Sequence, residues 1–197
     1  MKAEGDPARG ELVFRRRELS CLQCHAIGGA GALVGPDMQS LGASAPVDYL
    51  VESVLRPEAK QKEGYVSMMV LTKGGDVLSG VRVRENDREL VLRDAIRDEI
   101  SIPLDRIEMK KETISIMPAG LADLLTDGEF LDLVRFLSEL GRPGPYAVTA
   151  APVIRRWRTA DGAPVYSRVS GELPAEVTAA KGELNVVTPG KVRFKLN

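Results

Sequence analysis

Five consecutive residues, Cys21-Leu22-Gln23-Cys24-His25, contain both cysteines and the only histidine of the 197-residue chain. This Cys-x-x-Cys-His spacing is the attachment motif of c-type haem. Two residues between the thiols let them approach two vinyl groups on one edge of a porphyrin, and the next helical turn brings His25 under the iron. A neutral imidazole is a good axial ligand when its other ring nitrogen donates a hydrogen bond that holds the ring. The motif predicts one covalently attached haem c.

The same residues have three alternative interpretations: a zinc site, a redox-active dithiol or a structural disulfide. A tetrahedral zinc site usually takes four Cys or His ligands from separated pairs, whereas this chain offers three ligands in one pentapeptide. A redox dithiol needs no histidine after its second cysteine, and the glycines that follow do not predict a helix that would lower a thiol pKa. Haem attachment explains all three residues and is therefore the favoured interpretation.

Charge and hydropathy exclude several partners. The chain has 27 basic and 28 acidic residues, so no net field favours nucleic acid or an anionic membrane. Basic runs such as Arg15-Arg16-Arg17 are interpreted as solvated faces. No stretch approaches the roughly 20 apolar residues of a membrane-spanning helix, and the amino terminus lacks the apolar core of a signal peptide. Because haem c is attached outside the cytoplasm, we expect a periplasmic or exported parent protein.

Three segments have the pattern of amphipathic helices. Asp6 can cap a first helix with Pro7 at its first position. A second helix is predicted between Pro46 and Arg56, where apolar residues recur at i, i+3, i+4, i+7 and i+8. A third is predicted from Thr126 to just before Gly141.

Between the second and third predicted helices the apolar period changes to two. The pattern predicts strands at residues 65–73, 77–84, 89–93 and 99–103, separated by polar turns. We expect a meander of four or five short strands, curled into a half-barrel. Because its turns are polar, we expect this insertion at residues 64–115 to fold as a unit outside the haem crevice.

The order of these features resembles the class I cytochrome c fold, which has an amino-terminal helix, Cys-x-x-Cys-His, a Gly-Pro loop, a middle helix, a methionine loop and a last helix. More narrowly, residues 5–146 resemble the haem-binding domain of the planctomycete and verrucomicrobial type. The matching runs are Gly5-Asp6-Pro7-Ala8-Arg9-Gly10, Cys21 to His25, Val34-Gly35-Pro36-Asp37, Gly64-Tyr65, Gly80 and Met117-Pro118-Ala119-Gly120-Leu121. The Cys-x-x-Cys-His run is the specific part of this resemblance. In that family the domain belongs to large exported modular proteins, often with dehydrogenase-like modules.

The resemblance implies roles for five residues. Cys21 and Cys24 hold the haem covalently, His25 is the proximal iron ligand and Met117 the distal one. Pro36 packs on the proximal side, where its carbonyl orients the histidine. Of the six methionines, Met117 precedes a Pro-x-Gly loop just ahead of the last predicted helix, where a thioether can reach the iron without breaking regular structure. Met38 and an open sixth position are the alternatives.

The expected fold class is a mainly α cytochrome c-like domain with an inserted β meander and a β-rich extension. The cytochrome c domain is expected at residues 5–141, split by the insertion at 64–115. Weaker strand patterns at 153–158, 165–169 and 191–196 predict an extension at residues 142–197 that belongs to a truncated further module.

The predicted function is one-electron transfer by an electron carrier rather than an enzyme. Its expected partner is a redox protein or a fused dehydrogenase module, with a respiratory acceptor downstream. One alternative is a haem enzyme or gas sensor with a labile sixth position. Another is an interaction or homodimerisation module built on the β insertion, because unpaired strand edges invite pairing.

Overall fold

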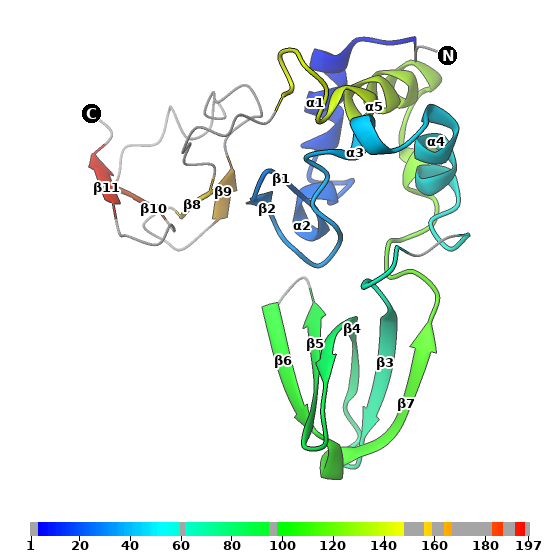
Figure 1. Cartoon of the computed structure of the whole chain (residues 1–197), viewed down its shortest axis with the longest axis vertical. Coiled ribbons are helices and arrows are strands. Elements are labelled where there is room, and N and C mark those ends of the chain that lie inside the picture. Colours follow the sequence, from blue (N-terminus) through cyan, green and yellow to red (C-terminus); the bar gives the residue numbers. More distant parts are fainter. Residues whose placement is uncertain are drawn as a thin grey trace.

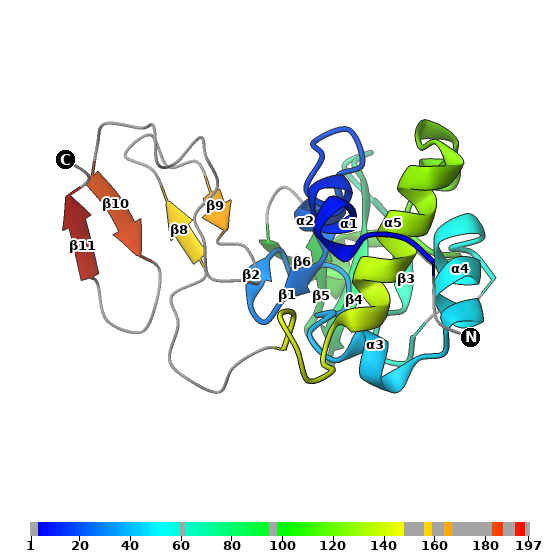
Figure 2. The same cartoon turned by 90° about the horizontal axis from the view of Figure 1, so that it is seen from above.

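In the part of the chain that the computed structural model describes, five α-helices lie at one end of a five-stranded sheet (Figures 1 and 2). The described residues are 4–59, 62–94 and 98–147, together with four strands within residues 156–195. The elements before residue 148 are α1 (Pro7–Phe14), α2 (Cys21–Cys24), β1 (Ala26–Ile27), β2 (Ala30–Gly31), α3 (Leu41–Ser44), α4 (Val47–Leu55), β3 (Ser67–Thr72), β4 (Val77–Glu85), β5 (Glu89–Asp94), β6 (Asp98–Pro103), the 3-10 helix η1 (Leu104–Arg106), β7 (Ile107–Thr113), the 3-10 helix η2 (Leu121–Leu124) and α5 (Asp127–Glu139).

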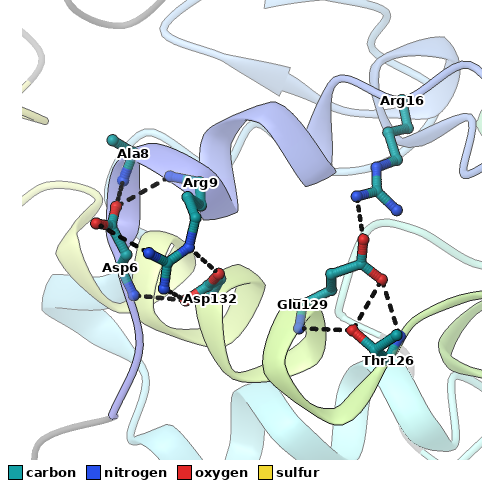
Figure 3. Close-up of polar contacts among 7 residues, drawn as sticks. All are labelled: Asp6, Ala8, Arg9, Arg16, Thr126, Glu129 and Asp132. Carbon is teal, nitrogen blue, oxygen red and sulfur yellow. Dashed lines mark hydrogen bonds and ion pairs between the residues drawn. The ribbon is translucent and has the colours of Figure 1, made fainter.

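The first and last helices begin at side-chain caps. The Asp6 carboxylate accepts hydrogen bonds from two backbone N–H groups in the first turn of α1. At α5, Thr126 and Glu129 form a reciprocal capping box. Arg16, just after α1, forms an ion pair with Glu129 (Figure 3). The predicted helix starts at Asp6 and Thr126 are confirmed, and the second cap also joins α5 to the end of α1.

Helices α1 and α5 approach so closely that their crossing requires glycine. A Cβ atom on Gly10 would lie 1.9 Å from the carbonyl oxygen of Asp132. The Asp132 side chain, part of a residue that is 5 % exposed, accepts a hydrogen bond from Arg9 Nε at 2.7 Å and another from the backbone N–H of Asp6 at 2.6 Å (Figure 3). The amino-terminal residues are thus held against the last helix by both shape and charge.

The sheet is antiparallel with strand order β6-β5-β4-β3-β7. The register shifts between Leu71 and Thr72 in β3, and between Arg82 and Arg84 in β4. Bulges of this kind increase local twist, which is consistent with the curled sheet in Figure 1. Its apolar core is formed by Met68, Val70, Leu90, Leu92 and Ile102.

The helices have a separate apolar core. Its buried members are Val13, Phe14, Leu19, Ile27, Leu50, Val54, Leu133, Phe136, Leu137, Leu140 and Tyr146. Phe136 lies at its centre and contacts the rings of Phe14 and Tyr146 at centroid distances of 5.8 and 5.3 Å. The described chain therefore has one core among the helices and another in the sheet.

The predicted mainly α fold class is wrong. A complete five-stranded antiparallel sheet with its own core stands beside the helices, and α2 and α3 have only four residues each. The described residues therefore have a mixed α and β architecture. The physical reason is that the period-two segment builds a sheet with an apolar core of its own, rather than a small addition to a helical domain.

The carboxy-terminal strands are β8 (Arg156–Arg158), β9 (Pro164–Tyr166), β10 (Glu183–Val186) and β11 (Val192–Lys195). They form a second sheet with order β11-β10-β8-β9 (Figure 2). The strands β8, β9 and β11 overlap the patterns predicted at 153–158, 165–169 and 191–196, whose remaining residues fall outside the described part of the chain, and β10 was not predicted. None of the described helices combines the length and hydropathy needed to cross a membrane.

Candidate functional site

A cavity of about 480 Å³ lies between the helices and the near end of the sheet. Its walls come from all five α-helices, from the loop after β2, and from β3 and β4. The lining side chains are mostly apolar and include Phe14, Leu19, Val34, Leu41, Leu50, Val54, Leu121, Leu125, Leu133 and Leu137. The five predicted site residues, Cys21, Cys24, His25, Pro36 and Met117, all line this one cavity.

The Cys-x-x-Cys-His motif forms a single helical turn. Ser20, with φ 55°, adopts the left-handed conformation and starts α2. The backbone N–H of His25 donates to the carbonyl oxygen of Cys21 at 2.8 Å, and His25 then leaves the helix with extended backbone angles. This turn brings both sulfur atoms and the imidazole to the same cavity.

Both cysteines are free thiols in a partly buried setting. Burial raises the pKa of Cys21 to about 11, and the neighbouring Cys24 adds to the shift. Burial also raises the pKa of Cys24. A redox-active dithiol works through a thiolate with a lowered pKa, so these shifts point away from that interpretation.

The imidazole of His25 is held by the carbonyl group of Pro36, with 3.0 Å between Nδ1 and the oxygen. Because a carbonyl oxygen can only accept, Nδ1 carries the proton and Nε2 retains its lone pair. Burial lowers the pKa of His25, against a smaller opposite effect of the Pro36 hydrogen bond. The side chain is therefore a neutral imidazole with one nitrogen available to a metal. The contact between Pro36 and His25 is the one that the resemblance implied.

Gly35 makes room for this ring. A Cβ atom on Gly35 would lie 2.4 Å from Cε1 and 2.6 Å from Nδ1 of His25. The backbone N–H of Gly35 also donates to the carbonyl oxygen of Cys24 at 2.6 Å. The Gly-Pro pair thus seats the imidazole from one side and ties the loop to the motif.

The loop between the motif and Pro36 contains a tight hairpin that was not among the predicted elements. Strands β1 and β2 are joined by Gly28 and Gly29, whose φ angles of 58° and 79° are those of a type I′ turn. The carboxylate of Asp37 accepts hydrogen bonds from the N–H groups of both glycines, at 3.0 and 2.8 Å. These bonds fix the position of the segment that carries Pro36.

Two of the described methionines line the cavity, Met38 and Met117. Met38 follows the Pro36 loop and packs against the core of the helices. Met117 comes from the segment between the sheet and α5, where its backbone N–H donates to Ser115 Oγ at 3.1 Å. Gly120, with φ 79°, then turns the chain into η2. Met68 lies in the sheet core and Met109, on β7, is 47 % exposed; neither lines the cavity.

The sheet forms part of the cavity wall, so the expectation that it folds outside the crevice is wrong. Ser67 of β3 and Val81 of β4 are register partners, and both line the cavity. In addition, Arg93 of β5 donates to the carbonyl oxygen of Leu33 at 2.9 Å, which ties the sheet to the loop after β2. The sequence predicted the strands but not that two of them border the cavity. Period-two alternation within a strand carries no information on what packs against the end of the strand.

Sequence reasoning also missed Lys62 and Tyr65, which lie just before β3 and line the cavity. No motif marked them, although Tyr65 belongs to a Gly-Tyr pair that carries part of the resemblance. Arg15 and Arg16, in contrast, are engaged in ion pairs with Glu11 and Glu129. Two arginines of the basic run after α1 are thus paired with carboxylates of the same chain.

No protein-family model and no curated protein matches the chain. Among the described residues, no cluster of three or more His, Cys, Asp or Glu side chains is arranged to hold a metal ion. The candidate function therefore rests on the cavity and on Cys21, Cys24, His25, Pro36 and Met117, which line it.

Proposed function

We propose that the chain is a covalent haem c-binding electron-transfer protein. In this proposal Cys21 and Cys24 hold the haem, and His25 and Met117 are its axial ligands. The observation that carries it is the convergence of these side chains on one apolar cavity, although Met117 follows the whole sheet in sequence.

The cavity is compatible with such a group. Its volume of about 480 Å³ lies within the roughly 300–1,000 Å³ typical of ligand and cofactor pockets. Its walls are mainly apolar, as a porphyrin face requires, with the thiols of Cys21 and Cys24 on one helical turn. Polar side chains are confined to a minority of the lining residues, among them Lys62 and Tyr65.

Each residue has a defined task. The thiols of Cys21 and Cys24 anchor the group at one edge, and the Pro36 carbonyl holds His25 with Nε2 free to bind iron. The thioether of Met117 is a soft ligand, and a His/Met pair stabilises ferrous iron and raises the reduction potential. When bound, the haem iron supplies the one-electron change between ferrous and ferric states.

The partner and compartment follow from the chemistry of haem c. We propose that electrons arrive from a docked dehydrogenase or a fused dehydrogenase module and leave toward a respiratory acceptor. We also propose that the parent protein is periplasmic or exported, since haem c is attached there.

Covalent attachment is tested by replacing both cysteines. Cys21→Ala combined with Cys24→Ala should abolish haem staining on a denaturing gel and leave an incompletely folded chain, because the porphyrin is the largest apolar body of the helical part. The wild-type protein, produced with the haem-attachment machinery, is the positive control. Retained stain in the double variant would overturn the attachment.

The distal ligand is tested by a matched methionine pair. Met117→Ala should lower the reduction potential and let the ferrous protein bind carbon monoxide, because an iron position becomes accessible. Met38→Ala also removes a cavity-lining thioether but should leave both properties close to wild type. A wild-type spectrum and potential in Met117→Ala would move the assignment to Met38 or to an open iron.

Carbon monoxide also separates electron transfer from the sensor alternative. Immediate, stoichiometric binding by the ferrous wild-type protein would favour a haem enzyme or gas sensor with a labile sixth position. Slow or absent binding is expected for a stable bond between iron and Met117.

A further inference from the structure

A buried hydroxyl group in the cavity wall has no partner in the described part of the chain. Ser67, at the start of β3, is 2 % exposed and lines the cavity. Its backbone is paired with Val81 and Thr113 in the two neighbouring strands, whereas no described group hydrogen-bonds its Oγ. A buried hydroxyl normally has a partner, because leaving it unpaired costs the hydration that it loses. The buried hydroxyl of Ser67 therefore indicates that its hydrogen-bond partner is an atom of a ligand in the cavity.

The polar side chains that line the cavity together with Ser67 favour an anionic hydrogen-bond partner. Among the lining residues that the structure describes, Lys62 is the one lysine or arginine, and Tyr65 brings a phenol to the same cavity. The backbone N–H of Tyr65 donates to the carbonyl oxygen of Lys62 at 3.0 Å, which closes a turn between the two. Ser115 also lines the cavity and, while its oxygen accepts from Met117, keeps its O–H to donate. An ammonium group and three hydroxyls suit a carboxylate.

This polar set belongs to the sheet side of the cavity. Lys62, Tyr65 and Ser67 come from the chain that enters β3, whereas Cys21 and Cys24 come from α2, and these two elements lie apart in both views (Figures 1 and 2). A haem carries its two propionates on a different edge from the vinyl groups that react with cysteines. A group anchored at α2 thus has its carboxylates available to residues elsewhere on the wall.

We propose that Ser67, together with Lys62 and Tyr65, forms a carboxylate-binding subsite that holds a haem propionate. The inference rests on the proposed haem function and adds a role for the sheet, which orients the cofactor from the side opposite to its covalent anchors. Ser67 and Lys62 act as positioning residues, since neither reaches the iron in this assignment.

The test uses the haem-loaded protein and two substitutions, Ser67→Ala and Lys62→Met. Resonance Raman spectroscopy of the ferrous protein reads out the propionate bending band, whose frequency follows the hydrogen bonding of the carboxylate. We expect both variants to shift this band. Lys62→Met should also lower the reduction potential, because removing a positive charge near the haem favours ferric iron, and Lys62→Arg should restore it. Matched controls are Ser79→Ala on β4 and Lys73→Met after β3, two exposed residues that do not line the cavity.

The outcomes distinguish a failure of this carboxylate subsite from a failure of the proposed haem function. Haem content is first measured as the pyridine haemochrome, and a wild-type protein without covalent haem would overturn the proposed function itself. If haem c is present but neither variant moves the propionate band, the carboxylate does not bind there and Ser67 bonds only to an ordered water. A band shift in Ser67→Ala that also occurs in Ser79→Ala would likewise overturn the subsite, because it would reflect a general change in the sheet.

Discussion

The helical part and the five-stranded sheet differ in how their apolar cores relate to the cavity. Several core residues of the helices also line the cavity, including Phe14, Leu50, Leu133 and Leu137. None of the five buried residues of the sheet core does so. The core of the helices is thus continuous with the candidate cofactor site, whereas that of the sheet is complete without it.

This difference predicts two kinds of stability. The helical part should depend on the cofactor and on long-range ties such as Arg9 to Asp132, because much of its apolar surface faces the cavity. The sheet should depend on its own strand pairing and on cross-strand ion pairs such as Arg84 with Glu89 and Glu99. Among the described residues of the five-stranded sheet, Ser67 and Val81 are the two that line the cavity.

The largest effect is expected where α1 crosses α5. Gly10→Ala would place a methyl group 1.9 Å from the carbonyl oxygen of Asp132, so the two helices must separate, at a cost of about 4 kcal/mol in the free energy of unfolding. Gly128→Ala, on α5 with no atom within 4 Å of the added Cβ, is the matched control and should stabilise by about 0.5 kcal/mol. Chemical denaturation measures both, and a small loss in Gly10→Ala would show that the helical part does not depend on this crossing.

A matched pair of leucines separates the two cores. Leu137→Ala and Leu92→Ala each remove a buried side chain, and each should cost about 3 kcal/mol in the free energy of unfolding. Only Leu137 lines the cavity, so only its variant should change the visible haem spectrum. An altered spectrum in Leu92→Ala would mean that the sheet core also supports the cofactor site, and the contrast between the two regions would fail.

A smaller effect concerns the ion pair between the end of α1 and the start of α5. The hydrogen bond from Arg16, followed by those from Thr126, lowers the pKa of Glu129 from its ordinary 4.5 to about 2. A lowered pKa stabilises the fold above about pH 4.5, and this contribution is lost as the pH falls toward 2. In thermal unfolding experiments, the Glu129→Gln variant should therefore lose less stability than the wild type as the pH falls from about 4.5 toward 2.

The control for the acid experiment is Glu108→Gln, an exposed residue of β7 without an ion pair among the described residues. It should keep the wild-type pH dependence. If Glu129→Gln follows the same acid curve as the wild type, the Arg16 contact does not contribute to joining the two helices.

Local signals in the sequence were sufficient for the elements that local physics controls. Asp6 before Pro7 and Thr126 before Glu129 predicted helix starts because a cap is satisfied within one turn. The hairpin at Gly28 and Gly29 was missed, although two adjacent glycines are a signal for such a turn. The mainly α fold class failed because the strands pack into a sheet with an apolar core of its own, and periodicity within one strand does not encode that packing.

The sequence by itself determined the chemistry available at the site. Both thiols and the single imidazole occupy one pentapeptide, so any fold that forms its helical turn brings them together. Only the tertiary structure decided that Pro36 accepts from His25, that Met38 and Met117 both reach the cavity, and that Ser67 of the sheet closes its wall. The physical reason is distance along the chain: a motif within one turn is set by backbone geometry, whereas a wall built from α2, α5 and β3 exists only after their faces have packed.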